Sequence, residues 1–295
     1  MPDGVRRARI HKSVKIVRAR AFFCRRNLIY VEFHDGVEII ELSAFAGCVL
    51  LKSVKLLGVK IIKKFAFSNC TVLTDVEFGD KLETIEEFAF NRCSSLKKIR
   101  IPTVRTVGEG AFAWCYNLAD VECDKELRTL HDAAFRNCPE LKRIALPLKS
   151  IMMGDLAFGQ CPKLTTVDLV GGIHQTVASL NLESWRNDMN NEIDSINQTL
   201  PTITRGKTPE IQHWMRTVIQ RLNHYKAEHH NLLKEATTLL ELALWKANLS
   251  DEGDELERER HRTRGSRKRA RKEICVTSGA SIVIKNVLPF LQLSE

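Results

Sequence analysis

One short motif recurs from the N-terminal end of the chain to Cys161 and constrains the fold more than any other feature. The motif Ala-Phe-x-x-Cys ends at Cys48, Cys70, Cys93, Cys115, Cys138 and Cys161, so successive copies lie 22 or 23 positions apart. An earlier copy has Phe22 in the Phe position and Arg25 in the Cys position. A fixed period of this size is typical of a solenoid, in which similar turns of chain stack and share one core. The sequence therefore predicts about seven stacked rungs whose outer surface is suited to binding.

Within each rung, the apolar residues recur at fixed offsets from the motif. The stretch Val76-Glu77-Phe78 alternates between apolar and polar residues, as a short strand does. The stretch from Leu82 to Ile85 predicts a second short extended segment. The spacing Ile-x-x-x-Ala-Phe-x-x-Cys is close to helical, so we expect a turn of helix there. Because one rung cannot bury its apolar side alone, stacking must close the core.

The full pattern, Leu-x-x-Ile-x-Leu-Pro followed by Ile-x-x-x-Ala-Phe-x-x-Cys-x-x-Leu, resembles the leucine-rich repeats of the BspA-like, Treponema type. Ile101-Pro102 and Leu146-Pro147 carry the Leu-Pro element, and the match covers residues 5 to about 170. The resemblance implies an α/β fold: a right-handed leucine-rich repeat solenoid with this same period and with parallel short strands along one face that serves as a binding surface. It implies no catalytic residues and names no ligand.

The outward positions of the strands carry charges that change sign along the stack. The first strands place these residues there: Glu32, Lys55, Glu77, Arg100, Glu122, Ala145 and Asp168. The second strands place these: Glu38, Lys60, Glu83, Arg105, Arg128 and Lys149. Opposite charges on neighbouring strands stabilise each other, so a mutually neutralising ladder is the favoured interpretation. The alternative is a partner-binding face, with like charge gathered at Arg105, Arg128 and Lys149.

The nine cysteines are interpreted as core residues, because six of them occupy the same slot of the repeat. A free cysteine at a regular inward position behaves as a small apolar residue. Disulfides or a metal site are the weaker alternative, since the chain has no C-x-x-C pair for zinc. The chain also has no Gly-rich phosphate loop, no H-E-x-x-H and no G-x-S-x-G. We therefore expect neither metal nor cofactor, and no enzyme.

A helical hairpin is predicted after Gly171-Gly172, where the repeat stops. Apolar residues at helical spacing predict a first helix of about 20 residues from 182 to 200. Thr208, as the N-cap before Pro209, starts a second helix that we expect to run to about 247. Its apolar heptad comprises Ile211, Met215, Val218, Leu222, Tyr225, His229, Leu232, Ala236, Leu239 and Ala243. The hairpin is expected to cap the last rung, and self-association through the long helix is the alternative.

The positive charge is concentrated near the C-terminal end. Residues 258–272 contain nine Lys or Arg and one acidic residue, against a formal net charge of +9 for the chain. Segment 250–273 is interpreted as a disordered linker. The candidate residues for nuclear import or nucleic-acid contact are Arg267, Lys268, Arg269, Arg271 and Lys272. A solvated linker is the equal alternative.

The helical tail extends the resemblance nearly to the end of the chain. Segments 184–198, 224–230 and 282–291 are similar to the tail of a diatom-expanded group of BspA-like proteins. Residues 274–295 form an apolar segment, in which 282–291 faintly resembles an F-box core. The predicted division is therefore a solenoid (1–172), a helical cap (173–249), a basic linker (250–273) and an apolar segment (274–295).

These features predict a non-enzymatic scaffold for protein–protein interaction. The alternatives are a nuclear nucleic-acid-associated protein that uses 258–272 and, less favoured, a ubiquitin-ligase-type adaptor. No apolar run reaches the ~18 residues that a membrane span needs. The first residues lack the apolar stretch of a secretory signal, so we expect an intracellular location, cytoplasmic or nuclear.

Overall fold

The structure is a computed structural model that describes residues 4–170, 183–203 and 206–261. By its internal contacts the chain divides into two compact units. One unit comprises Met1–Thr176 and Asn187–Gln220, and the other comprises Val177–Arg186 and Arg221–Glu295. Predictions that concern residues 262–295, including the F-box-like segment, lie outside the described residues.

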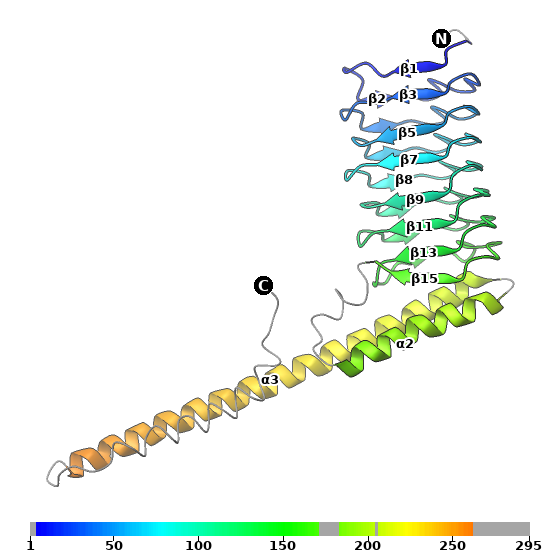
Figure 1. The fold of residues 1–295 in the computed structure, drawn as a ribbon. Helices are drawn as coiled ribbons and strands as arrows, with labels where there is room; N and C mark the ends of the chain where they lie inside the picture. Colours follow the sequence, from blue (N-terminus) through cyan, green and yellow to red (C-terminus); the bar gives the residue numbers. More distant parts are fainter. Residues whose placement is uncertain (1–3, 171–182, 204–205, 262–295) are drawn as a thin grey trace. The chain divides into compact units, whose positions relative to one another are not determined.

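The repeats form a solenoid in which each rung contributes two short strands, as predicted (Figure 1). The first strands of successive rungs are β1 (Arg7–Arg9), β3 (Tyr30–Glu32), β5 (Ser53–Leu56), β7 (Asp75–Phe78), β9 (Lys98–Ile101), β11 (Asp120–Cys123), β13 (Arg143–Leu146) and β15 (Thr166–Leu169). They pair in parallel, and Val54 lies beside Val76 while Val121 lies beside Ile144. Equivalent residues of neighbouring rungs therefore stand next to one another. This row consists of two four-stranded sheets, with the interruption between β7 and β9.

The second strands are each only two residues long and form one continuous seven-stranded parallel sheet. They are β2 (Ile16–Val17), β4 (Ile39–Ile40), β6 (Ile61–Ile62), β8 (Thr84–Ile85), β10 (Thr106–Val107), β12 (Thr129–Leu130) and β14 (Met152–Met153). The extended segment predicted from Leu82 to Ile85 is thus a strand only at its last two residues. The sheet ladder alone is too short to hold a rung, so most of the stacking energy must come from the core.

The core contains a column of stacked phenylalanine rings, one from each Ala-Phe motif. Phe45 and Phe67 have ring centroids 5.1 Å apart and an interplanar angle of 4°, and Phe67 and Phe90 repeat both values. The column runs from Phe22 to Phe158. Each such aromatic pair contributes about 0.5–1.5 kcal/mol beyond the burial of its surface. The repeated Phe therefore fixes both the core and the spacing of the rungs.

The turn of helix predicted at the Ala-Phe motif is wrong. Two residues in this stretch have left-handed backbone conformations, for example Phe65 at φ 59° and Asn69 at φ 61°. The amides of Phe65, Phe67 and Asn69 donate to carbonyls of the next rung, whereas those of Ala66 and Ser68 bond within the turn. Side chains three and four residues apart still face inward, which is why the sequence looks helical. Hydrogen bonds between neighbouring rungs, which join residues far apart in the sequence, decide the backbone instead.

The cysteines of the motif lie in the core, as predicted. Each Sγ donates to the carbonyl oxygen of the motif phenylalanine in the preceding rung, from Cys93 to Phe67 at 3.2 Å and from Cys115 to Phe90 at 3.3 Å. Burial raises the pKa of Cys115 to about 12, so the thiol stays protonated and remains a donor. The repeated cysteine therefore satisfies a buried turn carbonyl.

Two helices follow the solenoid, as predicted: α2 (Glu183–Thr199) and α3 (Lys207–His261), with a short 3-10 turn η1 (Leu200–Thr202) between them. Trp214 donates from Nε1 to the carbonyl of Glu192 at 2.9 Å, which ties the two helices together. α3 extends to His261, past the end predicted at about 247, and so includes residues 250–261 of the segment predicted as a linker. Leu, Glu and Arg, which make up 255–260, are strong helix formers.

The beginning of α3 satisfies polar groups of the last rung. Lys207 donates from Nζ to the carbonyls of Pro162 at 2.7 Å and Leu164 at 2.5 Å. Burial lowers the pKa of this ammonium. Thr208, predicted as the N-cap, lies inside the helix, and its hydroxyl accepts from the Phe158 amide at 3.0 Å. These contacts cover backbone groups that would otherwise end the stack without partners.

The apolar stripe of α3 is buried mainly over its first part. Ile211, Met215, Val218 and Leu222 are buried, whereas the second part exposes Leu232, Leu239, Leu242, Leu244 and Trp245. A hairpin partner of 17 residues cannot cover a helix of 55 residues. Self-association through this exposed part of α3 stays a prediction.

Candidate functional site

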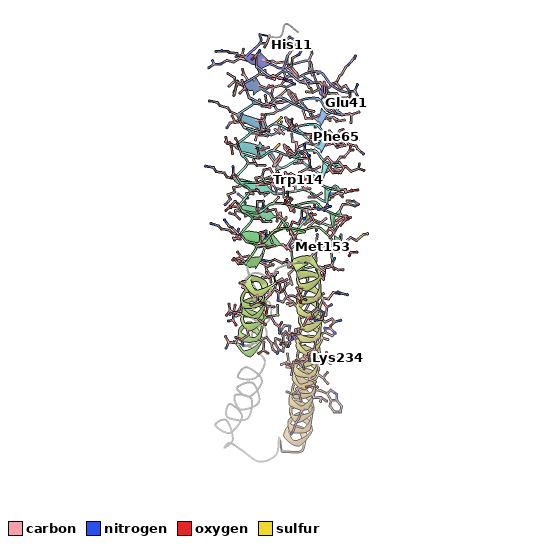
Figure 2. All side chains as sticks on the ribbon, turned by 90° about the vertical axis from the view of Figure 1, so that its right-hand side faces the viewer. His11, Glu41, Phe65, Trp114, Met153 and Lys234 are labelled. Atoms are coloured by element: carbon pink, nitrogen blue, oxygen red, sulfur yellow. The ribbon has the colours of Figure 1, made fainter. Side chains whose placement is uncertain are left out.

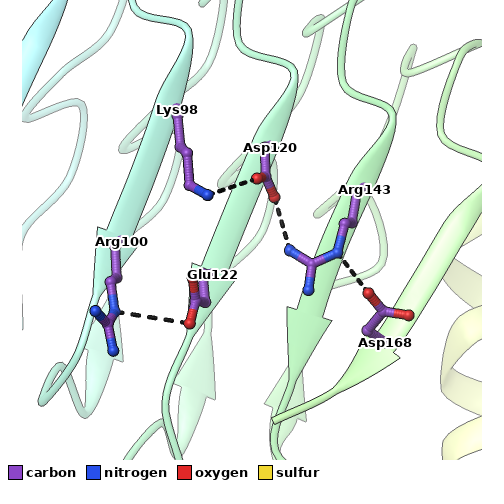
Figure 3. A network of polar contacts seen from close by, with 6 residues as sticks. All are labelled: Lys98, Arg100, Asp120, Glu122, Arg143 and Asp168. Atoms are coloured by element: carbon purple, nitrogen blue, oxygen red, sulfur yellow. Dashed lines mark hydrogen bonds and ion pairs between the residues drawn. The ribbon is translucent and has the colours of Figure 1, made fainter. Parts of the chain in front are cut away.

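Charged side chains line the first strands in pairs, one pair for every two rungs. Nε of Arg9 lies 2.6 Å from a carboxylate oxygen of Glu32, and Nζ of Lys55 lies 2.6 Å from Glu77. Farther along, Nε of Arg100 lies 3.6 Å from Glu122 (Figure 3). Hydrogen bonding and the charge of Glu77 raise the pKa of Lys55, so the ammonium stays charged. The predicted alternation of sign therefore produces mutual neutralisation.

A second network on the same strands was not predicted. Lys98, Asp120 and Arg143 stand two positions before members of the first series, and Asp168 belongs to that series. Asp120 on β11 accepts from Lys98 at 3.0 Å and from Arg143 at 2.9 Å (Figure 3). Arg143 also donates from Nε to Asp168 at 2.5 Å. Burial by itself raises the pKa of Asp120, but the hydrogen bonds from Lys98 and Arg143 outweigh it and lower the pKa overall. The alternating signs at these positions could have revealed the network from sequence.

The second-strand row is less regular than predicted. Lys60 donates to Glu38 at 2.9 Å, whereas Arg105 and Arg128 form no ion pair within the described residues. The placement of Lys149 in this row is wrong, because β12 pairs with β14 so that Thr129 stands beside Met152. Ile151, one residue before Met152, therefore stands beside Arg128.

Lys149 lies in the loop before β14, and its Nζ donates to the carbonyl of Lys125. The register of the last rung follows the next motif, Met153-x-x-x-Ala157, and the loop after Pro147 absorbs the difference. The predicted accumulation of like charge is therefore reduced to Arg105 and Arg128.

An exposed group of aromatic and arginine side chains lies on the turns, where no site was predicted. The guanidinium of Arg92 lies 5.9 Å from the ring centroid of Trp114, and Trp114 meets Tyr116 edge to face with centroids 6.2 Å apart. Trp114 (labelled in Figure 2) is 36% exposed and Tyr116 is 44% exposed. We call these three residues the turn cluster. The residues at these positions of the repeat differ from rung to rung, so the repeat pattern gave no signal for the turn cluster.

Two further aromatic rings stack on one another at a different position of the turns. Phe65 and Phe88 have ring centroids 5.3 Å apart, and both adopt left-handed backbone conformations. The equivalent residue of the next rung is Gly110, with φ +57°, where an added Cβ would lie 2.4 Å from the Phe88 ring. Glycine at 110 thus leaves room for the Phe88 ring.

An open hollow of about 510 Å³ lies where the first-strand row is interrupted between β7 and β9. Its walls are formed by Asp75, Val76, Glu77, Phe78, Arg100 and Pro102. Glu77 and Arg100, both predicted site residues, thus border one space, although each has its ion-pair partner on the opposite side. The hollow is large enough to receive a side chain from a partner.

The described residues contain no group of three or more His, Cys, Asp or Glu side chains that could hold a metal ion. None of the described helices combines the length and the apolar character needed to cross a membrane. The nucleic-acid candidates Arg267, Lys268, Arg269, Arg271 and Lys272 lie outside the described residues.

Several solved structures are similar to the chain over about half of its length. Among solved structures, the chain is similar to a leucine-rich repeat protein of T. pallidum, with 29% identity over 55% of this chain and 72% of that chain and a TM-score of 0.45. A leucine-rich repeat protein of Eubacterium ventriosum has 29% identity, with 53% of this chain and 43% of that chain covered and a TM-score of 0.49. No curated protein matches the chain.

The family described as BspA type leucine rich repeat region has a model that matches residues 4–104 and 60–187, with six copies of the repeat. These residues carry the Phe column and the cysteine hydrogen bonds described above. The more specific likeness of the helical tail to a diatom-expanded group stays a prediction. The chain belongs to the BspA-type leucine-rich repeat family.

Proposed function

We propose that the chain is a non-enzymatic scaffold that holds a protein partner against the outside of its solenoid. The stacked rungs give a long outer surface, and the inward residues are committed to the core. Repeat solenoids present extended binding surfaces of this kind. The proposal therefore concerns side chains that point outward.

The turn cluster is the observation that carries this proposal. Trp, Tyr and Arg are the residue types that most often contribute binding energy in protein interfaces. Arg92, Trp114 and Tyr116 are exposed and already lie against one another. Because the three side chains are held in place before binding, a partner would lose little entropy in ordering them.

The charged residues of the strand face are the second candidate for partner contact. These predicted residues are Glu32, Lys55, Glu77, Arg100 and Glu122 on the first strands, with Arg105 and Arg128 on the second. Most of them are exposed, with the Lys55 side chain at 69%. A partner that used the paired charges would have to compete with existing ion pairs, so we place them second to the turn cluster.

Proximity labelling with the full-length chain tests the proposal. The wild type is compared with Trp114→Ala plus Tyr116→Ala, and with a matched control, Leu50→Ala plus Leu57→Ala. Leu50 and Leu57 are 43% and 39% exposed, so the control also removes exposed apolar surface. A third variant, Lys55→Glu plus Glu77→Lys, retains an ion pair but reverses the charge pattern.

We expect a defined set of labelled proteins to be lost in the turn-cluster variant and kept in the matched control. Loss in the charge-swap variant alone would move the binding site to the strand face. If the labelled proteins are the same for all four chains, neither surface holds a partner and the proposed scaffold role is wrong.

A further inference from the structure

The first rung has a charge composition unlike that of any later rung. Residues 4–27 contain nine Lys or Arg and no Asp or Glu: Arg6, Arg7, Arg9, Lys12, Lys15, Arg18, Arg20, Arg25 and Arg26. This single rung carries as many positive charges as the formal net charge of the whole chain, +9. Outside 258–272 the formal charges of the chain sum to nearly zero, because acidic residues elsewhere offset this strongly basic rung.

Most of these cations are exposed and without an acidic partner. All of them except Arg25 are exposed. Arg9 pairs with Glu32 of the next rung. Within the described residues, no ion pair is formed by seven of them: Arg6, Arg7, Lys12, Lys15, Arg18, Arg20 and Arg26. In later rungs, by contrast, cations such as Lys98 and Arg143 are neutralised.

The cations are spread along the rim of the rung rather than gathered at one point. Arg7 and Arg9 are the outward residues of β1, and Lys15 and Arg18 flank β2, and both strands lie at the edges of their sheets. Outward residues on a strand are ~6.6 Å apart, close to the ~6.8 Å rise of two nucleotides along one strand of a duplex. Neighbouring cations can therefore contact phosphates that lie two nucleotides apart.

The residue types also favour phosphate. Seven of the nine cations are arginines, whose planar guanidinium groups bind phosphate oxygens through two hydrogen bonds. The Phe23 side chain is 47% exposed, and the Arg20 guanidinium lies 5.9 Å from its ring centroid. An exposed ring next to cations is a platform on which a base can stack.

Protection of a sheet edge is the structural alternative, because edge strands often carry charged residues that prevent pairing with other chains. Charged residues of both signs would also protect the edge, and they would avoid the repulsion among the like charges of this rung. We propose that the first rung binds the phosphate backbone of nucleic acid. This site is separate from the turn cluster and from 258–272, so the protein-scaffold function does not depend on it.

Fluorescence anisotropy of the full-length chain with a labelled 24-base-pair DNA duplex and a labelled single-stranded RNA of the same length tests this proposal. The rung variant carries Arg7→Gln, Lys15→Gln, Arg18→Gln and Arg20→Gln. The matched control removes four exposed cations elsewhere on the solenoid, through Lys52→Gln, Lys97→Gln, Arg136→Gln and Lys142→Gln. Both are repeated in a background with Arg267, Lys268, Arg269, Arg271 and Lys272 all changed to Gln, which removes the other basic candidate.

Each phosphate contact contributes ~0.9 to the magnitude of the slope of log affinity against log salt for the DNA duplex and ~0.7 for the single-stranded RNA, or about four- to fivefold in affinity near 150 mM salt. We therefore expect the rung variant to weaken binding to at least one of the two probes at least tenfold, with a slope lower by up to about 3.6. The control should change affinity less than threefold. Restoring charge with Lys at 7, 18 and 20 and the native Lys15 should recover most of the affinity.

Circular dichroism and thermal unfolding of each variant separate lost binding from lost folding, and the Lys version gives a second check if the Gln version unfolds. Equal affinity of the rung variant and the wild type for both probes would overturn the proposal, as would an effect no larger than that of the control. Absence of binding by the wild type at 50 mM salt would do the same. Tighter binding to phosphatidylserine vesicles than to either probe, lost in the rung variant, would assign the rung to membranes instead.

Discussion

Inside, the first rung and the later rungs are built alike. Phe22 stacks on Phe45 with ring centroids 4.8 Å apart, much as Phe67 stacks on Phe90 at 5.1 Å. Outside, they differ, because the first rung gathers cations whereas a later rung such as that of β11 places Asp120 between two cations. The repeated inward residues therefore specify the fold, and the outward residues are free to differ in what they bind.

The largest expected effect is the loss of stability when one phenylalanine is removed from the core column. This loss should be larger in the middle of the column than at its end. Phe90→Ala should lower the free energy of unfolding by about 3–5 kcal/mol, because a large ring between two others is lost. Phe90 is stacked on both Phe67 and Phe112 and is fully buried, whereas among the described residues Phe22 stacks on Phe45 alone. Phe22→Ala should therefore cost at least ~1 kcal/mol less.

Urea unfolding of the two variants, followed by circular dichroism, measures this difference. Equal losses would mean that the rungs unfold independently of their neighbours, against the idea of one continuous column. A small loss for both would show that the Phe column contributes little to stability.

The second expected effect concerns the paired charges of a later rung. Arg143→Gln should lower the free energy of unfolding at neutral pH by about 1 kcal/mol, because two partly exposed, solvent-screened pairs are lost. The pKa of Asp120 is lowered in the folded chain. Its contribution is therefore fully present above the unfolded pKa of ~3.9 and is lost as the pH falls through the lower folded pKa.

Unfolding experiments at several pH values test this effect. The difference between wild type and Arg143→Gln should shrink below about pH 4 as Asp120 becomes protonated. Lys97→Gln, on an exposed lysine for which no ion pair is found among the described residues, is the control and should show no such trend. A difference that stays constant from pH 7 to pH 2 would contradict the ion-pair account.

The smallest expected effect is on the stability of the first rung. Changing Arg7, Lys15, Arg18 and Arg20 together to Gln should shift the free energy of unfolding by less than ~0.5 kcal/mol, because exposed unpaired charges contribute little. A slight gain is expected from reduced repulsion. Thermal unfolding at low salt measures it, and a loss of several degrees would show that these cations have a structural purpose.

Much of the fold could be predicted from sequence because the signal is periodic. Phe67 and Cys93 recur at one spacing, so their inward direction and their columns follow from the repeat alone. The helical hairpin could also be predicted, from the spacing of the apolar residues after the repeats. The left-handed turn at Phe65 was not, since its backbone depends on hydrogen bonds to the neighbouring rung, at Glu87. The alignment of Ile151 with the preceding rung was not predicted either, because the Ala-Phe motif that follows fixes this alignment.

The candidate sites were harder to predict from the sequence. The predicted charges at Lys55 and Glu77 were correctly interpreted as neutralising, since they follow the repeat. Trp114 and Tyr116 occupy positions where other rungs have unrelated residues, so no pattern marks them. The basic first rung was hidden by a net charge summed over the chain. A count of charges made rung by rung would have revealed it.

Amide hydrogen exchange of the full-length chain, with and without the 24-base-pair duplex or the single-stranded RNA, tests the contrast between the two regions most directly. The account predicts slow exchange at the inter-rung turn amides of Phe67 and Phe90 in either state, with added protection on binding confined within the solenoid to residues 4–27. Added protection spread evenly over the solenoid, or found only within 258–272, would contradict it.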